Sequence, residues 1–156
     1  MWHKRLSHFI TPLSIDDDRI VGVQLQIAPF VHAFIFQVYL PCSNHSVAVY
    51  KQYIDKLKDL HNLYSDQGIP IFLGDYNMSC LLDREQTRHV LLPLFLAYSN
   101  LCAINMLPSC KGASNSYVSH NGCYTLMIDY IGLPVERVDS VMHIEIVDDD
   151  FECVKT

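Results

Sequence analysis

A carboxylate and a carboxamide stand two residues apart at the end of an apolar stretch. Residues 69–80 read IPIFLGDYNMSC, which places Asp75 and Asn77 directly after a predicted buried strand. Open α/β sheets bind ligands at the carboxyl ends of their strands. A carboxylate there can deprotonate a water molecule or hold a metal, and the amide can orient a phosphate. The alternative is a Gly-Asp-Tyr-Asn turn, which is common after any strand.

Asp129 is a second acidic residue in apolar surroundings. It lies within the sequence TLMIDYIGLP, residues 125–134. An ionised carboxylate inside a strand is destabilising unless it is paired, hydrogen-bonded or bound to a metal, and aspartate is also rare in strands. Asp129 is therefore a candidate site residue. The alternative is an aspartate that faces solvent from one side of an edge strand.

A tyrosine closes another predicted strand. In FQVYLPCSN, residues 36–44, Tyr39 comes two residues before Pro41. A lone tyrosine at such a position more often packs than takes part in chemistry. Its interest lies in the order of the segments, which runs Y-x-P, a helix, G-D-Y-N, a second helix and I-D-Y-I.

The elements that must position these residues begin with two strands and a helix. Residues 19–27 and 32–40 alternate in strand fashion, and the short connection at 28–30 predicts an antiparallel pair. Apolar residues recur at a 3.6-residue period over 46–68, which predicts a helix. Ser46 is its expected N-cap and Gly68 its expected stop.

The second half of the chain predicts one more helix among several strands. A strand at 69–74 leads to a helix over 84–99, with Asp83 as N-cap and Pro93 expected to kink or divide it. Short strands are expected near 102–106, 115–119, 125–131 and 140–146. This order predicts a layered α/β or α+β domain with a mixed sheet.

Composition limits the classes of protein. The 156 residues fit one domain, and with 50% hydrophobic and 18% charged residues the chain is expected to fold. A net charge of −6 argues against a surface that binds nucleic acid through many phosphate contacts. It is compatible with a nuclease, because a metal-binding cluster of carboxylates is itself acidic. No apolar run reaches the roughly 18 residues of a membrane span.

The six cysteines form no CxxC pair. A reduced, intracellular setting, nuclear or cytoplasmic rather than secreted, is therefore expected, and no signal peptide is evident. A zinc site could be drawn from Cys110, His120 and Cys123, but the spacing fits no usual pattern.

The ordered motifs resemble the endonuclease/exonuclease/phosphatase superfamily of Mg²⁺-dependent phosphodiesterases. The segments VYLPCSN, GDYNMSC, YVSHNG and MIDYIGL are most similar to endonuclease domains of the non-LTR retrotransposon type. The resemblance extends from about residue 19 to residue 147. It implies a domain over 1–156 that is part of a four-layer α/β sandwich, with mixed, largely antiparallel sheets.

The resemblance also implies roles for individual residues. Asp75 matches the aspartate that orients or deprotonates the attacking water, and Asn77 the asparagine that contacts the scissile phosphate. Tyr39 matches a tyrosine that contacts the same phosphate. Asp129 matches the aspartate that orients the catalytic histidine. Mg²⁺ or Mn²⁺ is the implied cofactor and DNA the implied substrate.

Two parts of the family pattern have no counterpart in the sequence. The first is an N-terminal segment with an active-site asparagine and the metal-binding glutamate, and the second is a Ser-Asp-His segment that supplies the catalytic histidine. His143, expected in the last strand, is the only late histidine, and the acidic run 148–150 could bind a cation loosely. We therefore expect impaired phosphodiester hydrolysis; the alternatives are a non-catalytic fragment and a protein-interaction module. Loss of the first strands should also expose apolar surface.

Overall fold

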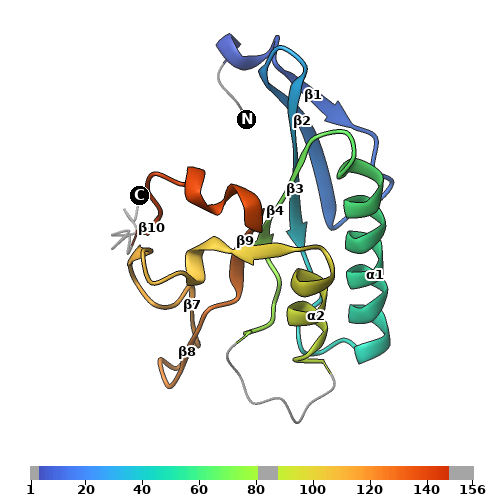
Figure 1. Cartoon of the computed structure of the whole chain (residues 1–156). Coiled ribbons are helices and arrows are strands. Elements are labelled where there is room, and N and C mark those ends of the chain that lie inside the picture. Colours follow the sequence, from blue (N-terminus) through green and yellow to red (C-terminus); the bar gives the residue numbers. More distant parts are fainter. Residues whose placement is uncertain (1–3, 81–87, 148–156) are drawn as a thin grey trace, which may run out of the picture.

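A six-stranded mixed sheet organises the protein. The computed structural model describes residues 4–80 and 88–147. The strand order is β1-β2-β3-β4-β9-β5, and only β3 and β4 run parallel. Figure 1 shows helices α1 and α2 on the same face of the sheet. The expectation of a mixed, largely antiparallel α/β fold is confirmed.

The bounds of the regular elements are as follows. The main sheet contains β1 (Ile10–Leu13), β2 (Ile20–Ala28), β3 (Val31–Tyr39), β4 (Ile69–Asp75), β5 (Leu101–Ala103) and β9 (Asp129–Pro134). The helices are α1 (Val47–Tyr64) and α2 (Leu91–Tyr98), and 3-10 turns lie at Lys4–Leu6, Ile104–Met106 and Val135–Ser140. Two small sheets pair β6 (Lys111–Gly112) with β10 (Glu145–Ile146) and β7 (Tyr117–Val118) with β8 (Thr125–Leu126).

The first two predicted strands form the expected antiparallel pair. In the register of β2 and β3, Ile20 lies opposite Val38 and Ala28 opposite Val31. The connection is shorter than expected, because Ala28 is still in β2 and only two residues make the turn.

Helix α1 begins as predicted but ends earlier. The Ser46 hydroxyl accepts a hydrogen bond from the Val49 backbone N–H at 3.3 Å, which makes Ser46 the N-cap. The helix ends at Tyr64 with Ser65 as C-cap, so the prediction that Gly68 stops it is wrong. Gly68 instead begins the approach to β4, where a Cβ would stand 2.4 Å from the His32 carbonyl oxygen. Glycine is required there because the two backbones lie too close for any side chain.

The second helix is also shorter than expected. Helix α2 begins at Leu91, so Pro93 falls in its first turn, where a missing N–H costs no intrahelical bond. The expected kink or division at Pro93 is therefore wrong for the part of the helix that the structure describes. The expected N-cap, Asp83, and the predicted start of the helix lie outside the described residues.

The segment predicted as one strand over 125–131 is two strands. β8 pairs with β7 in a hairpin, whereas β9 begins at Asp129 and joins the main sheet between β4 and β5. The predicted strand at 140–146 is likewise reduced to β10, and its first residue belongs to a 3-10 turn.

The core lies between the sheet and the two helices. Its largest fully buried side chains come from both layers, namely Tyr50, Tyr76, Tyr130, Phe36, Phe72, Phe95, Ile20, Leu40, Ile54, Leu57, Leu92 and Val38. Burial of these aromatic and aliphatic side chains is the main term that stabilises the fold. No helix in residues 4–80 or 88–147 is long and apolar enough to cross a membrane.

Candidate active site

Three of the predicted site residues meet at one edge of the main sheet. Tyr39 ends β3 and lies in register with Asp75, which ends β4. Asp75 lies in register with Asp129, the first residue of β9. Since residues in register on neighbouring strands have Cα atoms about 4.5–5.5 Å apart, the strand pairing brings these three residues together.

Gly74 positions Asp75 by letting two strands approach closely. Its φ is +134°, and a Cβ at this position would stand 2.1 Å from the Val38 carbonyl oxygen. Only glycine combines that backbone conformation with that contact. The glycine therefore lies within β4, one residue before the strand ends, rather than in a turn after it.

Asn77 is fixed by three hydrogen bonds, two to Asp75 and one to the Leu40 backbone. Its backbone N–H donates to Asp75 Oδ1 at 2.7 Å. Its side-chain Nδ2 donates to Asp75 Oδ2 at 3.1 Å and to the Leu40 carbonyl oxygen at 2.8 Å. Asn77 adopts a φ of +48°, a left-handed conformation that asparagine tolerates better than most residues. The Gly-Asp-Tyr-Asn segment is thus the end of β4 followed by a bend, rather than the turn that the alternative interpretation held, and it places an amide beside the carboxylate.

The environment of Asp75 favours its protonated form. Partial burial of the carboxyl is the largest cause of a raised pKa, and the neighbouring charge of Asp129 raises the pKa further. The two hydrogen bonds from Asn77 oppose this effect. A carboxylate with a raised pKa is a stronger proton acceptor than an ordinary aspartate, which suits a general base.

Asp129 is held at its backbone by two residues that the sequence analysis did not single out. Ser116 Oγ accepts from the backbone N–H groups of Ile128 and Asp129 at 3.1 and 3.0 Å. Asn105 Nδ2 donates to the Asp129 carbonyl oxygen at 2.9 Å. Asp129 lies at the start of its strand, so its predicted position in a strand interior is wrong.

Tyr39 is half exposed and lies beside a cation. Its relative exposure is 53%. The Arg19 guanidinium stands over the Tyr39 ring, 5.2 Å from its centroid, and its Nη1 is 3.4 Å from the Tyr39 carbonyl oxygen. Arg19 was missed in the sequence because the residue lies 20 positions away from the tyrosine that it contacts.

A cavity of about 640 Å³ opens beside Asn77. The tyrosines of the β7–β8 hairpin, Tyr117 and Tyr124, line it together with Arg88. Arg88 is almost fully buried; its guanidinium donates to the carbonyl oxygens of Pro41 and His45 and lies 4.4 Å from the centroid of the Tyr50 ring. This arginine fixes the loop after β3, which forms one wall of the cavity.

The late histidine does not join the site. His143 precedes β10 rather than lying in a strand, is exposed, and its Nε2 lies 3.2 Å from Glu145 Oε2. The region that the structure describes contains no cluster of three or more His, Cys, Asp or Glu side chains able to hold a metal, which leaves the zinc interpretation of Cys110, His120 and Cys123 without support. The acidic run 148–150 lies outside the described residues.

Comparison with known proteins identifies the fold. No family model and no curated protein matches the sequence. The endonuclease domain of TRAS1, a telomere-specific non-LTR retrotransposon, is similar with a TM-score of 0.61 at 15% identity, over 85% of this chain and 59% of that one. The 3′ phosphatase NExo from Neisseria, bound to product DNA hairpin, is similar with a TM-score of 0.60 at 16% identity, over 83% of this chain and 61% of that one.

A third similar structure carries the family description. It is an endonuclease/exonuclease/phosphatase family protein from Leptotrichia buccalis, with a TM-score of 0.53 at 13% identity, over 73% of this chain and 40% of that one. The chain thus spans about three fifths or less of the length of these three proteins. At sequence identities of 13–16%, the similarity shows a shared fold alone. The described chain has the fold of the endonuclease/exonuclease/phosphatase proteins, shared with the TRAS1 retrotransposon endonuclease domain.

Proposed function

We propose that the chain is built for metal-dependent hydrolysis of phosphodiester bonds, with DNA as the substrate. The observation that carries this proposal is the register that sets Tyr39, Asp75 and Asp129 side by side on three adjacent strands. The fold shared with an endonuclease domain and with a phosphatase solved on a DNA hairpin supports it.

In this proposal Asp75 accepts the proton of the attacking water. Its raised pKa makes it a better base, and Asp129 contributes to that effect by charge repulsion. Asn77 would contact the scissile phosphate through its amide. Because Nδ2 already donates to both Asp75 and Leu40, the longer bond, 3.1 Å to Asp75, is the one that substrate would replace.

Tyr39 would donate its phenolic O–H to the same phosphate. The nearby Arg19 guanidinium adds positive charge on this side of the site. Beyond the site, Tyr117 and Tyr124 offer exposed rings at the cavity beside Asn77, a kind of surface on which nucleobases stack.

Asp129 would hold a magnesium or manganese ion, beside the Asp75 carboxylate that accepts the proton. Mg²⁺ is usually bound by one or two carboxylates together with waters and substrate phosphate, so this hard oxygen donor fits its preference. When bound, the ion would offset negative charge on the leaving oxygen. Titration with Mn²⁺ tests binding without activity, because the paramagnetic ion should broaden the NMR signals of both aspartates, and less so in Asp129→Asn.

Nicking of supercoiled plasmid by the purified chain tests the activity. Asp75→Ala should lower the Mg²⁺-dependent rate by about 10²-fold or more, since a positioned base contributes about 10²–10⁴. Asp139→Ala is the matched control, because Asp139 is exposed on the 3-10 turn after β9. Circular dichroism must show that both variants fold. Equal nicking by wild type and Asp75→Ala would refute the assignment.

A non-catalytic module is the second candidate. Two observations favour it: Asp129 contacts no histidine among the described residues, and both N–H groups of the Asn77 amide are already bonded within the protein. Under this proposal the folded chain would show no nicking, with or without Asp75.

A further inference from the structure

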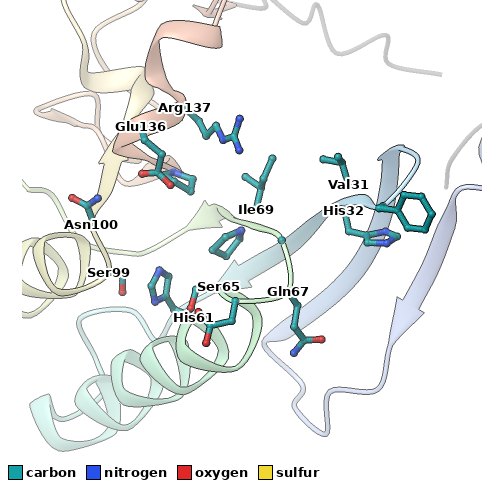
Figure 2. Close-up of a pocket in the computed structure, with 15 residues that line it drawn as sticks. Val31, His32, His61, Ser65, Gln67, Ile69, Ser99, Asn100, Glu136 and Arg137 are labelled. Atoms are coloured by element: carbon teal, nitrogen blue, oxygen red, sulfur yellow. The ribbon is translucent and has the colours of Figure 1, made fainter.

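A cysteine lies in the wall of the cavity beside Asn77. This cavity, of about 640 Å³, is lined by Cys42 and His45 from the loop between β3 and α1. Cys42 is partly exposed and His45 is exposed, so small molecules can reach both side chains. The cavity at the start of β4, of about 510 Å³, is lined by histidines but by no cysteine among the described residues, as Figure 2 shows for its labelled side chains.

One tight turn brings the Cys42 thiol and the His45 imidazole together. The backbone N–H of His45 donates to the Cys42 carbonyl oxygen at 3.1 Å, which closes the turn. Cys42 Sγ lies 3.9 Å from His45 Nδ1 and donates to Asn44 Oδ1 at 2.9 Å. A thiol beside a base is the arrangement that activates a cysteine as a nucleophile.

A buried arginine holds this turn in place and adds positive charge. Arg88 is 7% exposed, and its guanidinium donates to the carbonyl oxygens of Pro41 and His45, at the two ends of the turn. It forms no ion pair with a carboxylate in the described part of the chain. Burial lowers the pKa of Arg88, whereas negative charge on the Cys42 sulfur acts in the opposite direction. Arg88 therefore stabilises negative charge that develops on the sulfur as it attacks.

No histidine contact is found for the other described cysteines. Cys123 is exposed, and its Sγ donates to the Asn121 carbonyl oxygen at 3.7 Å. Burial raises the pKa of the Cys80 thiol, which disfavours its reactive form. Of the cysteines that the structure describes, Cys42 is thus the one that combines access with a neighbouring base.

We infer that Cys42 is a site of oxidation by hydrogen peroxide, with His45 as the base that takes the proton of its thiol. The proton moves from Sγ to His45 Nδ1 as the sulfur attacks one peroxide oxygen. An S–O bond forms and the O–O bond breaks, and the leaving hydroxide takes the proton from His45 and departs as water. The sulfur is oxidised to the sulfenic acid and the peroxide is reduced. The inference is independent of the proposed phosphodiester hydrolysis, because it uses none of the residues given a role there.

Trapping of the sulfenic acid tests the inference. The full chain is treated with hydrogen peroxide and dimedone, and the adducts at each cysteine are quantified over time by mass spectrometry. We expect Cys42 to react about tenfold or more faster than Cys123, because a positioned base accelerates a reaction about 10²–10⁴-fold and outweighs the greater exposure of Cys123. Access alone predicts the opposite order. A Cys42 rate equal to or below the Cys123 rate would overturn the inference.

Variants separate the base from the turn that carries it. His45→Gln should lower the Cys42 rate about tenfold or more and leave the Cys123 rate unchanged. The turn should persist, because His45 joins it through backbone atoms that glutamine retains. His120→Gln, which changes another exposed histidine, is the matched control and should leave both rates unchanged. Slow reaction of the partly buried Cys80 in each variant reports that the fold is intact. If Cys42 reacts at the wild-type rate in His45→Gln, the inference is wrong.

Discussion

Asp75 couples the candidate active site to the stability of the fold. Its pKa is raised above the ordinary value of 3.8, chiefly by burial and secondly by Asp129. A group whose pKa is raised on folding contributes stability below its unfolded pKa and loses it as the pH rises through the folded pKa. The deprotonated Asp75 that would act as a base is therefore less favourable for folding than the protonated form.

The pH dependence of unfolding should report this coupling. As the pH rises from about 3 to about 6, the free energy of unfolding of the wild type should fall relative to that of Asp75→Asn, which cannot ionise. Urea denaturation at a series of pH values measures the difference. The free energy of unfolding of Asp139→Asn, a substitution at an exposed position, should follow that of the wild type more closely than that of Asp75→Asn does. A difference between wild type and Asp75→Asn that stays constant across this range would contradict the raised pKa.

At the residue scale, the sequence predicts site residues that lie in a local pattern. It misses residues whose contacts are with positions far away in the sequence. Asp75 and Asn77 are recognisable because they stand together at the end of one strand, and two hydrogen bonds do join them. Ser116 and Asn105 hold the start of β9 from 13 and 24 positions away. No local pattern marks either of them, since their role exists only once the strands have paired.

At the element scale, the close approach of β3 and β4 depends on Gly74. Gly74→Ala should lower the free energy of unfolding by about 2–4 kcal/mol, because a Cβ would stand 2.1 Å from the Val38 carbonyl oxygen in a backbone region that alanine avoids. Gly122→Ala is the control: its φ is +68°, but nothing lies within 4 Å of its Cβ. It should lose only about 1–2 kcal/mol from backbone strain.

Chemical denaturation of the two alanine variants distinguishes contact from strain. Equal losses at both glycines would mean that positive φ alone explains the requirement for Gly74. A larger loss at Gly74, with Asp75-dependent activity also reduced, would show that strand spacing positions the carboxylate.

Elements with an apolar period that repeats over several turns were predicted well. Elements whose bounds depend on which strands pair were predicted poorly. Helix α1 was found because its apolar stripe repeats over several turns and Ser46 caps it. The run at 125–131 reads as one strand by residue type, but its halves pair with different neighbours: β8 with β7, and β9 with β4 and β5. Residue type could not reveal that division, because it is set by partners elsewhere in the chain.

At the scale of the whole molecule, the helices cover one face of the main sheet and leave apolar side chains on the other. Side chains alternate along a strand, so Ile35 points away from the helices while its neighbour Phe36 is fully buried beneath them. In register with Ile35 lie Val23 on β2 and Ile71 on β4, both only partly buried. None of these three belongs to the buried core cluster.

Because this open face is apolar, the chain should bind a hydrophobic dye while it is folded. Ile35→Thr should reduce that dye binding and change the free energy of unfolding by only about 1 kcal/mol or less, since threonine suits a strand and the side chain is already partly in water. Phe36→Ala, one residue along, should lose about 3–5 kcal/mol by leaving a cavity in the core. Dye fluorescence and urea denaturation together give both quantities. If Ile35→Thr destabilises the chain as much as Phe36→Ala, the second face is packed rather than open, and the sheet has a partner layer within the 156 residues.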